Sequence, residues 1–375
     1  MSLPPQPGQW GPGNPPPSGP PPGYPPGPPQ PPGYYPQPGW GPQQPPPPPK
    51  QGNSLKWLLI AVSVLLVIAI TVGVTLFVTR GSGGGETNGT NGASSIASAN
   101  DTGPVAIITF EPTCQAWMPI SNTMSQVQDN GWGDRDPSIS AASWTAEQRT
   151  QYEAVAKSLQ QTADQAVNFA RQTPNRVVRE LYEQFIVYAH AYADSIPTYT
   201  ESDNALALAN IAASLVVDSI CNSITYGSAV ARSTTATTSP PSATSDPTDP
   251  AEAKPFISKP DSQCDTVIQR GKALVTELSE WSKQDASFAA TDWTPEEKAA
   301  AAAAAPIMKS FADDMETIGK KSTNPTFQDL AFFAALYSRA YGNALATYKP
   351  ADNFLLIAGT RANNVLISAC QAAAR

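Results

Sequence analysis

Residues 175–204 are NRVVRELYEQFIVYAHAYADSIPTYTESDN, and residues 324–353 are NPTFQDLAFFAALYSRAYGNALATYKPADN. The two stretches align at a shift of 149 residues without a gap, and both keep an Ala-Tyr pair in the middle and an Asp-Asn pair at the end. The same shift aligns Trp132 with Trp281. Chance does not produce so many gapless matches of uncommon residues. The sequence therefore predicts a tandem duplication.

Each copy has the pattern of four helices. The third is expected at about 175–196 and 325–347, where apolar side chains recur at helical spacing. The second is expected to open at Thr145 and Thr294, because each threonine is followed three residues later by Gln or Glu, as in a capping box. β-branched alternation and hairpin dipeptides are scarce, so no strands are expected. We predict an all-α fold of two tandem four-helix bundles, with these tyrosines in the core: Tyr188, Tyr192, Tyr199, Tyr337, Tyr341 and Tyr348.

All four cysteines lie at the edges of the duplicated units. In an up-down-up-down bundle the first helix begins at the same end where the fourth helix finishes. We therefore predict the disulfides Cys114–Cys221 and Cys264–Cys370, although four cysteines allow three pairings. In the chain-entropy model, closing a loop of about 100 residues stabilises a bundle by up to about 4–5 kcal/mol.

Residues 57–78, WLLIAVSVLLVIAITVGVTLFV, contain no charged side chain. A run of this length can cross the hydrocarbon core of a bilayer. It is longer than the apolar region of a signal peptide and begins after a long tail, so we interpret it as a permanent anchor. Lys50 and Lys56 precede it and only Arg80 follows closely, which favours a cytoplasmic N-terminus. The cysteines all follow the anchor, as expected for an oxidising exterior.

The tail before the anchor is built from proline. Residues 1–49 carry no charge and hold 24 of the 40 prolines. With so few aliphatic residues the tail cannot bury a core, and we expect it to be disordered with polyproline II character. It is either a docking ligand for aromatic-lined grooves or an inert low-complexity segment.

Two further segments have the composition of linkers. One is rich in Gly, Ser and Asn and follows the anchor; the other is rich in Ser, Thr and Pro and separates the two copies, as a spacer or an O-glycosylated stalk. The two bundles should be able to reorient unless they share an interface. We divide the chain into a tail (1–54), a transmembrane helix (55–79), a flexible linker (80–108), a first bundle (109–230), a second linker (231–260) and a second bundle (261–375).

Charge and acidic motifs give little sign of chemistry. All 31 acidic residues lie after the anchor, and so acidic an exterior does not suit nucleic-acid binding. Asp134 and Asp136 resemble the start of a cation-binding loop, but the second copy keeps only the second acid and no bidentate glutamate follows, so we expect a turn. Asp203 and Asp352, each followed by Asn, fall where the fourth helix begins, and we expect caps there.

The single histidine limits catalysis further. His190 is the only one in the chain, which excludes His-based zinc clusters and most Ser-His-Asp arrangements. Its counterpart in the second copy is Arg339, which indicates a polar position facing solvent. The cysteines are poor nucleophiles because each has a matching partner and no histidine recurs with them. We predict no catalytic, cofactor-binding or metal-binding residue and no enzymatic activity.

The uncharged tail with PPGYPP and PPGYYP, the LKWLLIAV entry into one anchor, the Gly/Ser/Thr spacer and the Ala/Thr-rich exterior resemble the proline-rich single-pass membrane proteins of actinobacteria, including mycobacteria. The resemblance covers mainly residues 1–103. It implies a plasma membrane location with the C-terminal part facing the cell envelope. Many of those proteins have no assigned function, and the resemblance transfers no site residue.

The leading hypothesis is a non-enzymatic, membrane-anchored envelope protein. Its exterior bundles would bind a partner or envelope component, and its cytoplasmic tail would dock a protein. One alternative is a carboxylate-dependent envelope enzyme, such as a glycan-cleaving one, which needs two acids about 5–10 Å apart in a cleft. Another is a small-molecule or lipid sensor, which needs an apolar cavity inside one bundle. The ligand and the oligomeric state are left open.

Overall fold

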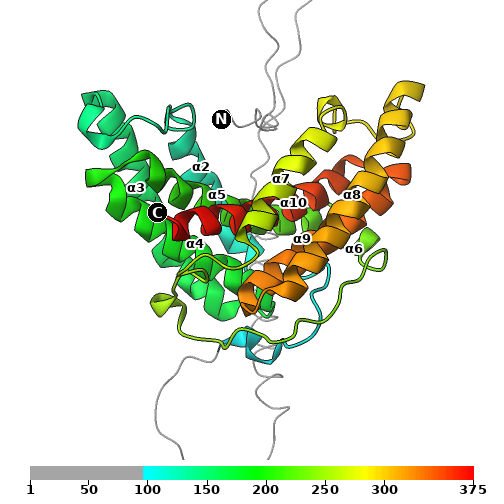
Figure 1. Ribbon diagram of the computed structural model, residues 1–375, viewed down its shortest axis with the longest axis horizontal. Helices are drawn as coiled ribbons and strands as arrows, with labels where there is room; N and C mark the ends of the chain where they lie inside the picture. The colour runs from blue at the N-terminus through cyan, green and yellow to red at the C-terminus, as the bar shows by residue number, and fades with distance from the viewer. Residues whose placement is uncertain (1–95) are drawn as a thin grey trace, which may run out of the picture. The chain divides into compact units, whose positions relative to one another are not determined.

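The computed structural model describes residues 96–375 (Figure 1). The expected tail and the anchor at 57–78 lie outside the described residues. Within 96–375 the structure contains nine α-helices, several short 3-10 turns and no strand, so the all-α class is confirmed. The helices are α2 (Cys114–Asp129), α3 (Ala146–Gln172), α4 (Arg176–Ser195), α5 (Asn204–Thr225), α6 (Ser228–Arg232), α7 (Cys264–Glu277), α8 (Pro295–Lys321), α9 (Pro325–Ala344) and α10 (Asn353–Ala373).

The second helix of each set begins at the expected capping box. Thr145 Oγ1 accepts a hydrogen bond from the backbone N–H of Gln148 at the start of α3, and the Gln148 side chain returns one to the Thr145 N–H. Thr294 and Glu297 do the same at the start of α8. These reciprocal bonds satisfy amides that the first helical turn leaves free. They fix where two of the longest helices begin.

The third helices, α4 and α9, form the centre of the core. Almost every residue of α9 is buried, and so are most residues of α4. The six tyrosines predicted for the core have 0–2% of their surface exposed. Trp132 Nε1 donates to the hydroxyl of Tyr192 at 3.1 Å, and Trp281 Nε1 donates to Tyr341 at 2.8 Å. Tyr192 and Tyr341 therefore pack in the core with their hydroxyls bonded to the segments that connect the first and second helices, whereas Tyr337 accepts from the N–H of Ile108 in the chain before α2.

Both disulfides have the pairing that the sequence predicts. Cys114 at the start of α2 is bonded to Cys221 near the end of α5, with 5.3 Å between the Cα atoms. Cys264 at the start of α7 is bonded to Cys370 near the end of α10, with a Cα separation of 5.5 Å. Each bond joins the first helix of a set to the fourth.

The two helix sets share an extensive interface. We call α2–α6 the first half and α7–α10 the second half. The two fourth helices, α5 and α10, pack along each other in the middle of the described unit (Figure 1), and α4 also touches α9. Arg375, just past the end of α10, contacts Asp203 at the start of α5, whereas Arg232, past the end of α5, contacts Asp352 at the start of α10. The fourth helices therefore run antiparallel.

The Ser/Thr/Pro-rich segment between the halves is hydrogen-bonded to both of them. Ser239 Oγ donates to Glu316 of α8 at 2.6 Å, and the N–H of Ser242 donates to Gln328 of α9 at 3.0 Å. A few residues later, Ser245 accepts a hydrogen bond from Arg179 of α4 at 2.8 Å. The segment thus connects the halves through side-chain contacts as well as through the chain.

One helical stretch among the described residues, Glu201–Thr225, is long and apolar enough to cross a membrane. Most of it is buried inside the fold, where Val216 and Val217 of α5 have no exposed surface. Such burial is typical of the central helix of a helical core. Its apolar character is explained by contacts on several sides at once, with α4, α10 and α2.

The disulfides give the first testable prediction. Replacing Cys114 and Cys221 by serine should lower the free energy of unfolding by up to about 4–5 kcal/mol, because the bond closes a loop of about 100 residues. The matched variant, C264S/C370S, closes a loop of nearly the same length and should lose a similar amount. Guanidinium denaturation followed by circular dichroism measures both. Unchanged midpoints in both variants would contradict the stabilising role.

Candidate functional site

Charged side chains are buried where the two halves meet. Glu180 of α4 and Asp329 of α9 have no exposed surface, and Arg176 and Arg179 of α4 are 1–2% exposed. Acidic and basic side chains are almost never fully buried unless they are paired. This cluster is therefore the least ordinary feature of the described residues, and we take it as the candidate functional site.

Glu180 and Asp329 occupy equivalent positions, because they are separated by the same 149 residues that separate the tryptophans and tyrosines. The antiparallel pairing of α5 with α10 places the halves in a reciprocal arrangement, in which each contacts the other through the same helices. A position near the centre of such an arrangement faces its own counterpart. Arg176, which holds Asp329, lies one helical turn before Glu180 on the same face of α4, so the two carboxyl groups lie close to each other at the α4–α9 contact.

Arg176 ties three segments together at this place. Its Nε donates to Asp329 Oδ2 at 2.7 Å and its Nη2 donates to Oδ1 at 3.0 Å, which is the bidentate geometry of a strong ion pair. The same guanidinium donates to the backbone carbonyls of Asp101 and Gly103, the latter at 3.0 Å. Arg176 thus joins α4 to α9 and to the chain that precedes α2.

Only one of the two carboxyl oxygens of Glu180 accepts a hydrogen bond. Oε1 accepts a hydrogen bond from Ser245 of the linker and lies 3.8 Å from Nη2 of Arg179. Oε2 has no hydrogen-bond donor within the described part of the chain, although it is fully buried. Burial raises the pKa of Glu180 well above its usual range, and the neighbouring charge of Asp329 raises it further.

The other acids of the cluster are shifted in the same direction. Burial raises the pKa of Asp329, while the hydrogen bonds and charge of Arg176 oppose the shift. Burial also raises the pKa of Glu183 to about 7, against the opposing charge of Arg179, whose Nε lies 3.7 Å from Glu183 Oε1. All three carboxyls therefore bind protons more tightly in the folded chain than in water.

The buried cluster of acids and arginines can bind protons and contains an ion pair, but a polymeric substrate such as a glycan cannot reach it. Glu180 and Asp329 are closed to solvent. A surface pocket of 280 Å³ reaches Asp101 and Arg176, and it is otherwise lined by residues 104–110 and the start of α4. Two acids converge here, but a sugar chain has no path to them. The pocket holds neither carboxyl of the pair.

Two ion pairs bind the ends of the fourth helices. Arg232 donates to both oxygens of Asp352 at 3.0 and 2.8 Å, and Arg375 donates to Asp203 at 2.5 Å. The aspartates also accept backbone N–H groups at the 3-10 turn before each helix, Asp352 from Lys349 at 2.9 Å. Asp203 and Asp352 are the residues directly before α5 and α10, as expected, but neither side chain makes a cap hydrogen bond to its helix; each closes the 3-10 turn before it. Their role in joining the halves was not foreseen from the sequence.

The predicted polar position at His190 lies beside an aspartate in both halves. His190 Nε2 lies 3.4 Å from Asp164 Oδ1, and Arg339 in the second half donates to Asp313 at 3.0 Å. Both pairs connect the second helix to the third. The side chain of His190 is 38% exposed, which agrees with the expectation of a position at the surface.

The acidic motif before α3 forms a turn, as expected. Asp136 accepts hydrogen bonds from the N–H and the hydroxyl of Ser138 at 2.9 and 2.7 Å. Residues 96–375 contain no group of three or more His, Cys, Asp or Glu that could hold a metal ion.

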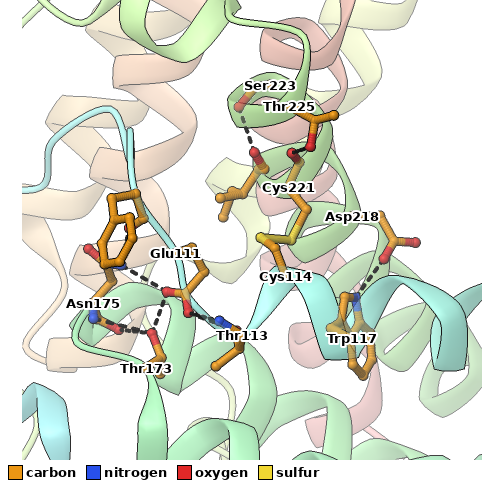
Figure 2. The surroundings of a disulfide bond; sticks show 12 residues. Glu111, Thr113, Cys114, Trp117, Thr173, Asn175, Asp218, Cys221, Ser223 and Thr225 are labelled. Atoms are coloured by element: carbon orange, nitrogen blue, oxygen red, sulfur yellow. Dashed lines mark hydrogen bonds between the residues drawn. A yellow bond between two sulfur atoms is a disulfide. The ribbon is translucent and has the colours of Figure 1, made fainter. Parts of the chain in front are cut away.

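Asp218 is a buried acid that the sequence analysis missed. It accepts hydrogen bonds from Trp117 Nε1 at 2.6 Å and from Ser121 Oγ at 2.8 Å, and so it joins α5 to α2 beside the first disulfide (Figure 2). Burial raises its pKa to about 6 while these two donors oppose the shift. The second half has Ile367 at the equivalent position, so a comparison of the copies gave no signal for it.

Glu111, on the other side of the same disulfide, was missed as well (Figure 2). Its carboxylate accepts from the N–H of Thr113 at 3.0 Å, from Thr173 Oγ1 at 2.5 Å and from Asn175 Nδ2 at 2.8 Å. It thereby holds the chain before α2 against the connection between α3 and α4. With this many donors the carboxylate is fully engaged in structure.

The two end pairs give a prediction that depends on their burial. The side chains of Arg232 and Asp352 are 15% and 2% exposed, whereas those of Arg375 and Asp203 are 33% and 15% exposed. R232A should lower the free energy of unfolding by about 2–4 kcal/mol, because it leaves a buried carboxylate without its cation. R375A should cost less, about 1 kcal/mol. Chemical denaturation measures both.

The control for these variants is R171A. Arg171 pairs with Asp249, whose side chain is 54% exposed, and the change should cost less than about 1 kcal/mol. Equal losses in R232A and R171A would show that the buried end pair has no special role.

Comparisons with known proteins give one family model and one similar mycobacterial protein. The family model of the mycobacterial ESX-1 associated protein matches residues 96–374, which includes all nine helices of the described region. An uncharacterized protein of Mycolicibacterium smegmatis (strain MKD8) is 41% identical over 349 residues, covering 90% of this chain and 92% of the relative. No solved structure matches. The chain therefore belongs to the family of mycobacterial ESX-1 associated proteins.

Proposed function

We propose that this protein is a non-enzymatic, membrane-anchored component of the mycobacterial cell envelope that is associated with the ESX-1 secretion system. In this proposal the helical halves bind a protein partner or an envelope component outside the plasma membrane. The proline-rich tail docks a protein in the cytoplasm. Family membership supports the association with secretion, and the uncharged run at 57–78 supports the single anchor.

The proposal includes an origin of the two halves by tandem duplication. Supporting it, the same hydrogen bonds recur at equivalent places in both halves. The tryptophan just before each second helix donates its indole N–H to a backbone carbonyl five residues earlier. The tyrosine that follows each third helix donates to a carbonyl in the segment after the first helix. The pairs are Trp144 with Ile139, Trp293 with Phe288, Tyr199 with Pro137, and Tyr348 with Ala286, at 2.9–3.1 Å.

One observation carries the non-enzymatic reading. The two acids that converge, Glu180 and Asp329, are closed to solvent, and their neighbours bond them to other parts of the same chain. The alternative of a glycan-cleaving enzyme needs a carboxyl pair in a cleft that admits a sugar chain. Charged side chains that bond the two halves to each other have a structural role, which is consistent with a protein that binds a partner through its surface.

The sensor alternative needs an apolar cavity within one bundle. Two surface pockets of the described region have volumes of 280 and 240 Å³, one beside residues 104–110 and one beside α6. Neither is enclosed by the four helices of a single half. The interior is filled by large side chains such as Trp117, Phe185 and Phe311.

The test is crosslinking and affinity mass spectrometry from native mycobacterial membranes. Full-length protein is compared with a form lacking residues 1–49 and with a form that carries a Gly/Ser tail of equal length in their place. We expect crosslinks to secretion-system proteins from the full-length form. Some of these crosslinks should disappear in both altered forms. The Gly/Ser tail has the same length as the natural tail but lacks the proline-rich sequence that docks in aromatic-lined grooves.

The three forms separate the parts of the proposal. Partners that persist in all forms assign binding to the exterior helices alone and contradict a docking role for the tail. The absence of specific crosslinks from every form contradicts the binding function itself.

A further inference from the structure

We propose that Glu180 and Asp329 hold a single proton between them, and that this shared proton is a latch that holds α4 against α9 where the two halves of the chain meet. The inference concerns the junction itself and does not depend on the identity of any partner.

The first support is the geometry of the pair. Glu180 and Asp329 come from equivalent positions on α4 and α9, and the reciprocal arrangement of the halves brings them together at the centre of the junction. Both side chains are closed to solvent. When two carboxyl groups lie side by side without solvent, the repulsion between their charges favours the state in which one of them keeps its proton.

The second support identifies the oxygen that carries the proton. Both oxygens of Asp329 accept hydrogen bonds from Arg176, as an ionised carboxylate does. In Glu180, Oε1 accepts from Ser245, whereas Oε2 is buried and receives no donor from the described residues. A buried oxygen without a donor is satisfied if it is itself the donor. The proposal therefore places the proton on Glu180 Oε2, with Asp329, held one helical turn away by Arg176, as its acceptor.

The third support is the charge surrounding the pair. From α4, Arg176 and Arg179 supply two positive charges, and Glu183 faces Arg179. The only charge that α9 brings to the pair is that of Asp329. The chain before α2 brings the charge of Asp101, which lies 3.5 Å from Arg176. The linker brings the neutral hydroxyl of Ser245. Arg176 is already shared by two carboxylates, so a further anion at Glu180 has no cation of its own nearby except Arg179, at 3.8 Å.

The consequence is a link between protonation and contact of the halves. When Glu180 releases its proton to water, the hydrogen bond to Asp329 is replaced by repulsion between two buried anions. The repulsion is relieved if α4 and α9 separate and water reaches the carboxylates. Folding with the halves in contact therefore takes up a proton.

The sign of the pH dependence follows from this uptake. The unfolded chain has an ordinary glutamate, which ionises near pH 4–5. The folded chain keeps the proton to higher pH, so the stabilisation is full at acid pH below the unfolded pKa and is lost as the pH rises toward the folded one. For each such proton, the unfolding equilibrium constant should rise up to about tenfold per pH unit in this window.

The variant E180Q tests the assignment. Glutamine keeps the size of the side chain, accepts from Ser245 and donates permanently to Asp329 through its amide. Unfolding of the full-length chain by denaturant is measured from about pH 5 to pH 8. We expect the slope of the logarithm of the unfolding constant against pH to fall by up to about one in E180Q relative to the natural chain.

Two further variants make the result specific. Glu201 is exposed at the turn before α5, so E201Q should leave the slope unchanged. E183Q removes the neighbouring acid whose pKa is raised to about 7, and its effect should add to that of E180Q in the double variant. An E180Q slope equal to that of the natural chain would overturn the proposal.

A distance measurement tests the latch apart from stability. Glu153 of α3 and Ala302 of α8 are exposed and equivalent. Spin labels at E153C and A302C report the separation of the halves, and the four natural cysteines are all in disulfides. We expect one narrow distance distribution at about pH 5.5, a broader and longer one at about pH 8.5, and a narrow one at both when E180Q is added. A distribution independent of pH in the natural background would overturn the latch.

Discussion

The contact between α5 and α10 is the constraint on which the rest of this fold depends. α5 is apolar on nearly every side, with small and branched residues such as Ala213, Val216 and Val217 entirely buried. A helix of that kind needs neighbours all round. Three helices of its own half can cover only part of it, and α10 covers another face. The halves are thus joined because neither fourth helix can be exposed to water.

That contact decides where polar groups are buried. When two similar halves meet through the same helices, a residue near the centre of the contact meets its own equivalent. For an apolar residue this meeting has no energetic cost, whereas two acids that meet repel each other. Buried polar groups of this kind are stable only if they find hydrogen-bond partners. Arg176, Ser245 and a shared proton together satisfy the pair. A buried network also fixes one alignment of α4 against α9, which an apolar contact would leave less defined.

Much of each half could be predicted from the sequence, because the relevant signals are local. The capping boxes at Thr145 and Thr294 each depend on a pattern of four consecutive residues. The helical spacing of the tyrosines can be recognised within a single helix. The disulfides followed from the topology of a bundle. The junction could not be predicted, since nothing near Glu180 in the chain indicates Asp329, and Arg375 finds Asp203 across 172 residues. Linker composition was also a weak guide, because serine hydroxyls such as that of Ser242 bond to side chains as well as to water.

The halves differ where they meet, and the difference has a physical reason. The positions equivalent to Arg176, Arg179 and Glu183 are Pro325, Gln328 and Phe332. Both acids of the pair lie at one place, so cations from a single half can reach both of them. A second set of arginines from α9 would bring excess positive charge into a site without water, where each unpaired ion costs several kcal/mol. Charge balance at a shared centre is therefore met by arginines from α4 alone, and the two halves differ at the positions where they meet.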